Sequence, residues 1–366
     1  MDKPLRILHV VVNMNRGGAE TLIMNLYRNM DRSKIQFDFL TCKEGVFDKE
    51  ILEMGGAINR IPYVTDVGHF EYIKALNKFF VTHPEYKIVH SHMDKMSGFI
   101  LRAAKKAGVS MRIAHSHNTS SEGSIAAKMY KWYSGISINK DATQFLACSN
   151  EASKWLFGKK SRSSLVLKNG IELDDFGFSH KVRNSEREKM GLDEKAQVIG
   201  HVGRFCEQKN HSFIIDIFDE LLKINPNAVL ILVGDGPLRT KIESKVTDMG
   251  LTNSVKFLGV RGNVNELLQA FDSFIFPSLH EGLPVTLVEA QASGLSCFIS
   301  EAITPEVNME TGLINYLPIN DKYQWVEKIN AIDKDFPREI AHHALNKKGY
   351  DIKNTAKVIE RLYLEG

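Results

Sequence analysis

The sequence lacks the features that would place the chain in a membrane or outside the cell. No apolar run in its 366 residues reaches the ~18 needed to span a bilayer, and the opening MDKPLRILHVVVNM predicts a short strand instead of a signal peptide. The four cysteines are scattered without a CxxC pair, which is typical of reduced thiols in a cytosolic protein. We therefore expect a cytoplasmic protein, with the inner face of the cell membrane as a candidate docking surface.

Charge is nearly balanced over the whole chain but not along it. The 47 Lys and Arg against 44 Asp and Glu give a net charge of +3. Residues 1–180 carry 25 basic and 18 acidic side chains (+7), whereas residues 181–366 carry 22 and 26 (−4). A basic first half favours an anionic partner, either nucleic acid or a membrane leaflet, and an ordinary lysine-rich surface is the alternative.

Strand and helix patterns alternate along the chain, without repeats or low-complexity tracts. In the first half, strands are predicted at 5–12, 37–41, 58–62, 88–92, 111–115 and 144–148, with helices at 18–29, 71–83 and 97–107. After a polar stretch that follows Asn169-Gly170, strands are predicted at 197–202, 228–233, 255–258 and 271–277, with helices at 210–224, 237–250 and 264–270. This alternation predicts an α/β fold with two Rossmann-like domains that face each other across a cleft. We place the domains at 1–180 and 181–350.

The loop after the first strand of each series carries candidate ligand-binding residues. Gly17 and Gly18 precede a helix whose N–H groups suit a phosphate, although a purely structural helix start explains them equally well. GxGxxG is absent and no acidic residue follows about 20 positions on, so the dinucleotide fingerprint is missing. In the second series, Arg204 and Lys209 follow Gly203 just before a helix, where two cations would suit a diphosphate. Exposed basic loop residues are the alternative, and these two residues alone do not decide between them.

Two glutamates lie eight residues apart in the segment HEGLPVTLVEA, which follows the strand predicted at 271–277. Glu281 enters a Gly/Pro loop, Pro284 suits the first turn of a helix, and Glu289 lies further along that helix. Such a strand, loop and helix N-terminus form a common anion site at the carboxyl edge of a parallel sheet. Glutamates that only offset the helix dipole are the alternative.

The ordered set of motifs resembles the retaining family 4 glycosyltransferases of the GT-B fold over nearly the whole chain. The matching motifs are Gly17-Gly18, Gly203-Arg204…Lys209, Gly234-Asp235-Gly236-Pro237 and Glu281…Glu289. One departure is Lys168-Asn169-Gly170, where the family often has Pro-Asn-Gly; the Asn-Gly turn is retained. The resemblance implies a C-terminal helix, near 351–366, that packs back on the N-terminal domain.

The resemblance also implies a role for each candidate residue. Arg204 and Lys209 would contact the diphosphate of a nucleotide-sugar, Glu289 the ribose hydroxyls, and Glu281 the donor sugar. Backbone at Gly259 and Val260 would lie against the base. Backbone N–H groups at Gly17, Gly18, Leu283 and Val285 would surround phosphate or sugar. The nucleotide-sugar site would also include Gly203, Gly282 and Pro284. A first-domain histidine near the donor sugar matches His117 best, with His115 as its rival.

Metal binding is not expected. Asp333-Lys334-Asp335 matches the Asp-x-Asp string that holds Mg²⁺ in many sugar-nucleotide enzymes, but it lies in a polar segment away from any predicted strand end. His90, His92, His115 and His117 form two His-x-His pairs that make zinc conceivable. We interpret them as polar residues that gather at the ends of adjacent strands, and we predict neither a metal nor another cofactor.

The segment 124–140 mixes lysines with Met129, Tyr130, Trp132 and Tyr133. This composition suits the interface of an anionic membrane, but a helix that packs its aromatic side chains inward is the interpretation we favour slightly.

Together the residues and the resemblance imply a metal-independent, retaining hexosyltransferase. It would move a hexosyl or N-acetylhexosaminyl group from a nucleoside-diphosphate sugar to a saccharide or lipid-linked saccharide of a surface polysaccharide. The preference for UDP rests on the resemblance alone. A UDP-sugar epimerase of the same fold is the first alternative, and an NAD-dependent dehydrogenase the second. A sugar- or nucleic-acid-binding protein is disfavoured because the candidate residues predict one cleft instead of a basic stripe.

Overall fold

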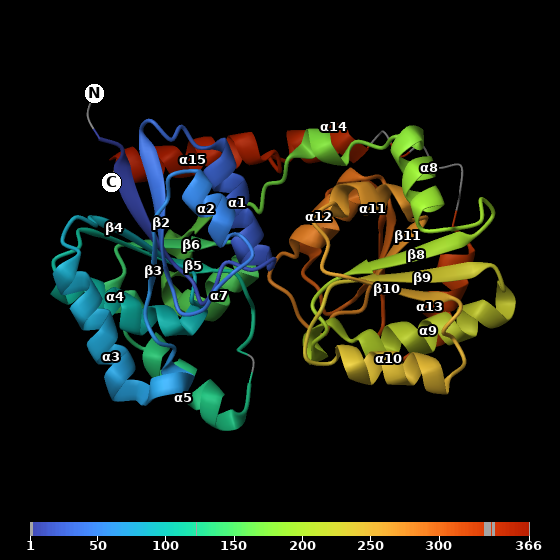
Figure 1. Cartoon of the computed structure of the whole chain (residues 1–366), viewed down its shortest axis with the longest axis horizontal. Coiled ribbons are helices and arrows are strands. Elements are labelled where there is room, and N and C mark those ends of the chain that lie inside the picture. Colours follow the sequence, from blue (N-terminus) through green and yellow to red (C-terminus); the bar gives the residue numbers. More distant parts are fainter. Residues whose placement is uncertain (1–2, 122, 333–337, 339–340, 366) are drawn as a thin grey trace. The chain divides into compact units, whose positions relative to one another are not determined.

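The computed structural model describes residues 3–121, 123–332, 338 and 341–365. The chain divides into two compact units, Met1–Gly170 with Ile352–Gly366, and Ile171–Asp351 (Figure 1). The segment 171–180, which the sequence assigned to the first domain, therefore belongs to the second unit.

The first unit contains a parallel sheet of seven strands in its described part, in the order β3-β2-β1-β4-β5-β6-β7. These strands are β1 (Leu5–Val10), β2 (Ile35–Thr41), β3 (Ile58–Arg60), β4 (Ile88–Ser91), β5 (Met111–Ser116), β6 (Gln144–Ala147) and β7 (Leu165–Val166). The α-helices of this unit are α1 (Gly18–Asn29), α2 (Asp48–Glu53), α3 (Val64–Thr82), α4 (Ser97–Lys106), α5 (Ile125–Gly135), α6 (Ile138–Asp141), α7 (Asn150–Phe157) and α15 (Ile352–Glu365).

The alternation of side chains along β1 divides the first unit's core into two layers. Ile7 packs in a cluster with residues of α1 and α15, whereas Leu8 packs in a second cluster with residues of α3 and α4. Successive residues of a strand point to opposite faces, so each face needs its own helical cover. Ile359 and Tyr363 of α15 are buried in the first cluster, which confirms that the C-terminal helix packs back on the N-terminal domain.

The second unit contains a parallel six-stranded sheet in its described part, in the order β10-β9-β8-β11-β12-β13. The strands are β8 (Gln197–Val202), β9 (Ala228–Val233), β10 (Val255–Gly259), β11 (Ser273–Phe276), β12 (Ser296–Ser300) and β13 (Ile314–Leu317). The α-helices are α8 (His180–Lys189), α9 (His211–Ile224), α10 (Arg239–Asp248), α11 (Val264–Ala270), α12 (Val285–Ala292), α13 (Lys322–Asn330) and α14 (Ala341–Lys347).

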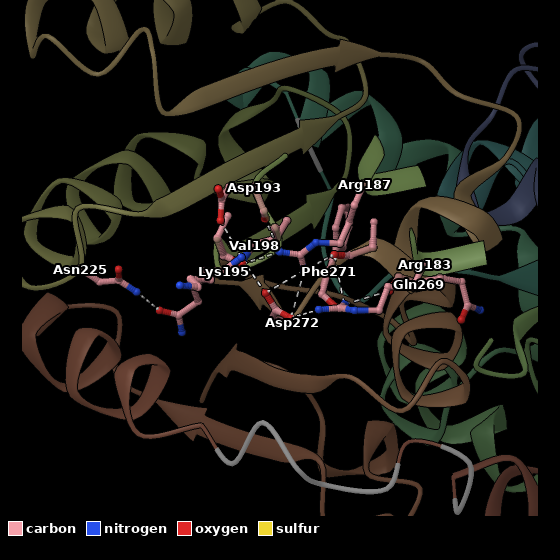
Figure 2. A network of polar contacts seen from close by, with 12 residues as sticks. Arg183, Arg187, Asp193, Lys195, Val198, Asn225, Gln269, Phe271 and Asp272 are labelled. Carbon is pink, nitrogen blue, oxygen red and sulfur yellow. Dashed lines mark hydrogen bonds and ion pairs between the residues drawn. The ribbon is translucent and has the colours of Figure 1, made fainter. Parts of the chain in front are cut away.

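A polar network anchors α8 to the second sheet (Figure 2). Asp272, just before β11, pairs with Arg183 at 2.5 Å and with Arg187 at 3.4 Å. The same carboxylate accepts a hydrogen bond of 2.7 Å from the backbone N–H of Val198 in β8. Because a partly buried charge is stable when it is paired and hydrogen-bonded, this network fixes α8 against the second sheet.

Candidate functional site

The loops that follow β8 and β11 are tied together in the second unit. These strands are neighbours at the point where the strand order reverses, which is where open α/β sheets bind ligands. The Gln208 side chain donates to the carbonyl of His280 at 2.8 Å, and the backbone N–H of Leu279 donates to the carbonyl of Gln208 at 2.8 Å. The loop with the predicted cations is therefore fixed against the loop with Glu281.

Lys209 and Glu281 form an ion pair at this edge. The Lys209 Nζ donates to Glu281 Oε1 at 2.6 Å, and the two side chains are only 15% and 8% exposed. The ammonium also lies over the ring of Phe276, 4.5 Å from its centroid. Two residues separated by 72 positions, both predicted site residues, thus meet in a partly buried place where an incoming anion would compete for the ammonium.

Three glycines allow the backbone to close up at the same edge. A Cβ on Gly234 would lie 2.1 Å from the carbonyl oxygen of Gly203, and the N–H of Gly234 donates to the carbonyl of Gly259. Gly234 and Gly259 also have positive φ angles of 132° and 69°. Glycine is required there because a side chain would clash or strain the backbone. The neighbouring Arg204 and Val260 are exposed.

Glu289 lies in α12 and is almost completely buried. Its side chain is 9% exposed and forms no hydrogen bond or ion pair with another described residue. Burial raises the pKa of Glu289 to about 7, because desolvation disfavours the charged form. The sequence predicted Pro284 in the first turn of this helix. In the structure Pro284 is instead the extended N-cap residue that immediately precedes the helix. The segment from Gly282 to Val285 is buried.

The first unit positions Gly17, Gly18 and His117 after its own strands. Gly17 is the N-cap of α1, where a Cβ would lie 2.3 Å from the Glu20 carboxylate, and a Cβ on Gly18 would meet nothing within 4 Å. His117 follows β5 and is partly exposed, whereas its rival His115 is fully buried within that strand. Of the two histidines, His117 therefore has the more accessible side chain.

Five histidines cluster on one face of the first sheet, beneath α15. They are His9 of β1, His90 of β4, His115 of β5, and His92 and His117 just beyond those strands. Among the described residues, two groups have ring nitrogens within 4.8 Å of one another, as a metal site would require: His9, His90 and His92, and His92, His115 and His117. Burial lowers the pKa of His9 and of His117 to about 3. It lowers those of the other three well below their usual value, and neighbouring imidazoles add to the effect.

Met129, Trp132 and Tyr133 of the segment 124–140 face solvent, contrary to the interpretation we favoured, whereas Tyr130 packs against the core of the first domain. Met129 is 66% and Trp132 61% exposed, and Ser134 is the buried residue of α5. On its inner side α5 packs closely against α4. A Cβ on Gly98 of α4 would lie 1.9 Å from the carbonyl oxygen of Ser134, so the contact requires a glycine there. Among the described residues, no helix is sufficiently long and apolar to cross a bilayer.

Family models match both halves of the chain. The model described as "Glycosyltransferase Family 4" matches residues 16–175, and that described as "Glycosyl transferases group 1" matches residues 182–350. A protein of Bacillus subtilis (strain 168), "Putative glycosyltransferase EpsF", is 38% identical over 98% of this chain and 96% of its own length. The chain belongs to the family 4 glycosyltransferases.

Other relatives of this glycosyltransferase are more distant. An Escherichia coli protein, "UDP-Gal:alpha-D-GlcNAc-diphosphoundecaprenol alpha-1,3-galactosyltransferase", is 28% identical over 77% of the chain and 76% of its own length. The Staphylococcus aureus "Capsular polysaccharide biosynthesis glycosyltransferase CapH" is 29% identical over 78% of each. The match to a glycosyltransferase over nearly the full length leaves no support for a dehydrogenase or an epimerase.

Solved structures share the fold of this glycosyltransferase. Anabaena Alr3699/HepE, in complex with UDP-glucose, has a TM-score of 0.82 at 20% identity and covers 99% of this chain and 100% of its own. WaaG, a glycosyltransferase involved in lipopolysaccharide biosynthesis, has a TM-score of 0.72 at 16% identity over 98% of this chain and 100% of its own. The predicted GT-B fold of two Rossmann-like domains is thereby confirmed.

Sequence reasoning missed His9, a member of the histidine cluster, and Tyr363, which is hydrogen-bonded to that cluster. The strand register pairs His9 directly with His90, and the Tyr363 hydroxyl lies 2.6 Å from Nδ1 of His90. A histidine in the first strand was a visible signal, whereas a tyrosine 273 residues away from its partner was not. Asp333 and Asp335, the dismissed Asp-x-Asp string, lie outside the described residues.

Proposed function

We propose that this glycosyltransferase transfers a hexosyl or N-acetylhexosaminyl group from a nucleoside-diphosphate sugar to a saccharide or lipid-linked saccharide acceptor. UDP is the proposed nucleotide, the configuration at the anomeric carbon is retained, and surface polysaccharide synthesis is the proposed context. The observation that carries the proposal is the pairing of Lys209 with Glu281 at the switch point of the second sheet. The names of relatives that use UDP-galactose or build capsular polysaccharide support it.

The charges at this edge suit cleavage of a glycosyl–phosphate bond. As the bond breaks, negative charge grows on the diphosphate and positive charge on the anomeric carbon. Lys209 and the exposed Arg204 supply fixed positive charge for the leaving diphosphate, and the N–H groups at the start of α12 add to it. Because protein cations supply this charge, we propose that transfer needs no metal and persists in EDTA.

Each acidic residue has its own proposed ligand. Glu289 is buried without a side-chain partner among the described residues, so a hydroxyl pair that hydrogen-bonds to its carboxylate would satisfy it; ribose offers such a pair. Glu281 would pass from the Lys209 ammonium to the hydroxyls of the donor sugar once the diphosphate engages Lys209. The exposed residue Val260 would support the base through its backbone, and His117 would contact the sugar.

A Glu281→Gln substitution tests this assignment. The amide keeps the size of the side chain but loses the charge, so UDP binding should persist while sugar transfer to an acceptor falls by about a hundredfold or more. Transfer would be measured with radiolabelled UDP-sugars and a lipid-linked acceptor, in EDTA, and UDP binding by calorimetry. Glu301→Gln, an exposed glutamate after β12 in the same unit, is the matched control and should leave both unchanged. Full transfer by Glu281→Gln would refute the role given to this residue.

We further propose that the first domain meets an anionic membrane through α3 and α5. Ile125, Met129 and Trp132 are exposed on α5, and Phe70 is 85% exposed on α3. The two helices are joined by a hydrogen bond of 2.8 Å between His69 and the Tyr130 hydroxyl. Figure 1 shows both along the lower edge of this domain. Apolar side chains interleaved with lysines suit the headgroup region, and a lipid-linked acceptor would be presented there.

Trp132→Ser should weaken binding to vesicles that contain phosphatidylglycerol by about tenfold, because a large aromatic side chain no longer enters the interface. Cosedimentation with anionic and zwitterionic vesicles measures this. Tyr323→Ser is the matched control, since Tyr323 is an exposed aromatic residue beside Lys322 in the second unit. Equal losses in the two variants, or no preference for anionic vesicles, would contradict the proposed surface.

A further inference from the structure

The histidine cluster of the first domain is organised as two separate chains of hydrogen bonds. In one chain, His9 Nδ1 lies 3.0 Å from His92 Nε2, and His92 Nδ1 lies 2.8 Å from His117 Nε2. In the other, the Tyr363 hydroxyl lies 2.6 Å from His90 Nδ1, and His90 Nε2 lies 3.1 Å from His115 Nδ1. Because burial lowers the pKa of every histidine in the cluster, each ring is neutral near pH 7 and carries one N–H.

The buried end of the first chain fixes its direction. His9 Nε2 is inaccessible and has no hydrogen-bond partner among the described residues. A proton on that nitrogen would be a buried N–H without an acceptor, which is rarer in folded proteins than a lone pair without a donor. The proton of His9 therefore resides on Nδ1 and is donated to His92 Nε2.

The direction then propagates along the chain to its accessible end. His92 accepts at Nε2, so its own proton must be on Nδ1, from which it is donated to His117 Nε2. His117 accepts at Nε2 and must carry its proton on Nδ1. That nitrogen makes no hydrogen bond to a described residue, and His117 is the partly exposed member of the cluster.

The second chain has no such direction. If Tyr363 donates to His90, then His115 Nε2 carries a buried N–H without a partner; if the chain runs the other way, the Tyr363 hydroxyl is the unpartnered donor. Either arrangement leaves one donor unsatisfied. Two chains on the same sheet face thus differ in whether their tautomers are determined, which makes the second chain an internal control.

We propose that His9 and His92 are positioning residues that hold His117 as its Nδ1–H tautomer, so that it offers a hydrogen-bond donor to an oxygen of the donor sugar. Contact between His117 and the sugar rests on the proposed function, whereas the tautomer does not. A neutral donor can bind a hydroxyl or ring oxygen of the sugar but cannot remove a proton from it at Nδ1. His117 would then orient the sugar and would not be a general base.

A metal ion at these histidines is less consistent with the geometry. Facing nitrogens 2.8–3.0 Å apart have room for a shared proton, and a metal would have to break those hydrogen bonds to use the same lone pairs. Neither candidate group includes a carboxylate to offset a divalent charge in a buried place. The hydrogen-bonded chain satisfies both nitrogens of His92 without any ion.

Nitrogen-15 NMR of the full-length, histidine-labelled protein tests the proposal without substrate. Protonated and unprotonated ring nitrogens have distinct chemical shifts, and His117→Gln identifies the His117 signals. We expect a protonated Nδ1 and an unprotonated Nε2 for His117, and no bound metal by elemental analysis. A proton on Nε2 of His117, or stoichiometric metal bound to the cluster, would overturn the proposal.

Paired variants then separate positioning from folding. His92→Phe removes the donor to His117, so the His117 tautomer should change and transfer should fall by about tenfold, the value of one hydrogen bond. His92→Asn keeps an amide near the Nδ1 position and should restore both in part. His90→Phe, in the second chain, should leave the His117 tautomer unchanged. An unchanged His117 tautomer in His92→Phe would refute the positioning of His117 by His92. A changed tautomer with full transfer would refute only the contact between His117 and the sugar.

Discussion

The two domains of this glycosyltransferase share a topology but differ in the chemistry of their sheet edges. In both, the first strand of the unit is central, two strands lie on one side of it, and the fourth strand lies on the other. In the second domain, the charged side chains of Lys209 and Glu281 lie beyond β8 and β11. In the first domain, the corresponding sheet edge has neutral imidazoles that are hydrogen-bonded to one another. The topology therefore determines where polar residues gather, and the residues determine which ligand they can bind.

The net charge of each half of the sequence does not match the charges at its sheet edge. The half of the sequence from 181 onward has a net charge of −4 and yet carries the proposed diphosphate site, while the basic first half carries the neutral histidines. Two cations at a helix N-terminus act within a few ångströms, and distant surface charges are screened beyond about 8–10 Å. The excess of basic residues in the first half is better matched to a membrane surface than to the nucleotide.

We expect the largest difference between the two domains in their loss of stability at acidic pH. The folded pKa of His9 and of His117 is about 3, below the unfolded value near 6.5, so the unfolded state binds more protons between these limits. The free energy of unfolding is therefore highest above about pH 6.5 and decreases as the pH falls toward 3. At two pH units below its unfolded pKa, each such histidine lowers the free energy of unfolding by about 2.7 kcal/mol.

Among the residues whose side chains the structure describes, five histidines with lowered pKa lie in the first domain, against His201 and His211 in the second. Hydrogen exchange between pH 7 and 4.5, corrected for the intrinsic rate, should therefore show loss of protection in β1, β4 and β5 before β8, β9 and β11. His9→Phe should shift the acid transition of the first domain to lower pH. Simultaneous loss in both domains, or earlier loss in the second, would remove the contrast.

The regular parts of the fold were predictable because hydrophobic patterns reflect burial on a sheet. The bounds of α1, β8, β9 and α11 agree with the predicted ranges. The strands β12 and β13 were not predicted, since short segments such as Ser296–Ser300 have a weak pattern. The exposed aromatic residues of α5 were expected to be buried because apolar composition alone does not distinguish a core-facing helix from an exposed one.

The candidate site was predictable as a set of residues but not as a set of contacts. Motif order indicated Arg204, Lys209, Glu281 and Glu289, and parallel-sheet topology brings the loops that hold Lys209 and Glu281 to one edge. The ion pair between Lys209 and Glu281 depends on packing across 72 residues, which no local pattern contains. The same reason explains why Tyr363 and His9 were missed.

The most direct test of the central claim is calorimetric titration of UDP and of uridine into the wild-type protein and Lys209→Ala. Removal of the ammonium deletes a charge-assisted contact to phosphate and leaves the Glu281 carboxylate to repel it, so UDP affinity should fall by about 10- to 100-fold. Uridine affinity should remain unchanged, because the nucleoside carries no phosphate. Equal weakening of UDP and uridine, or no change in UDP affinity, would contradict a diphosphate site at Lys209.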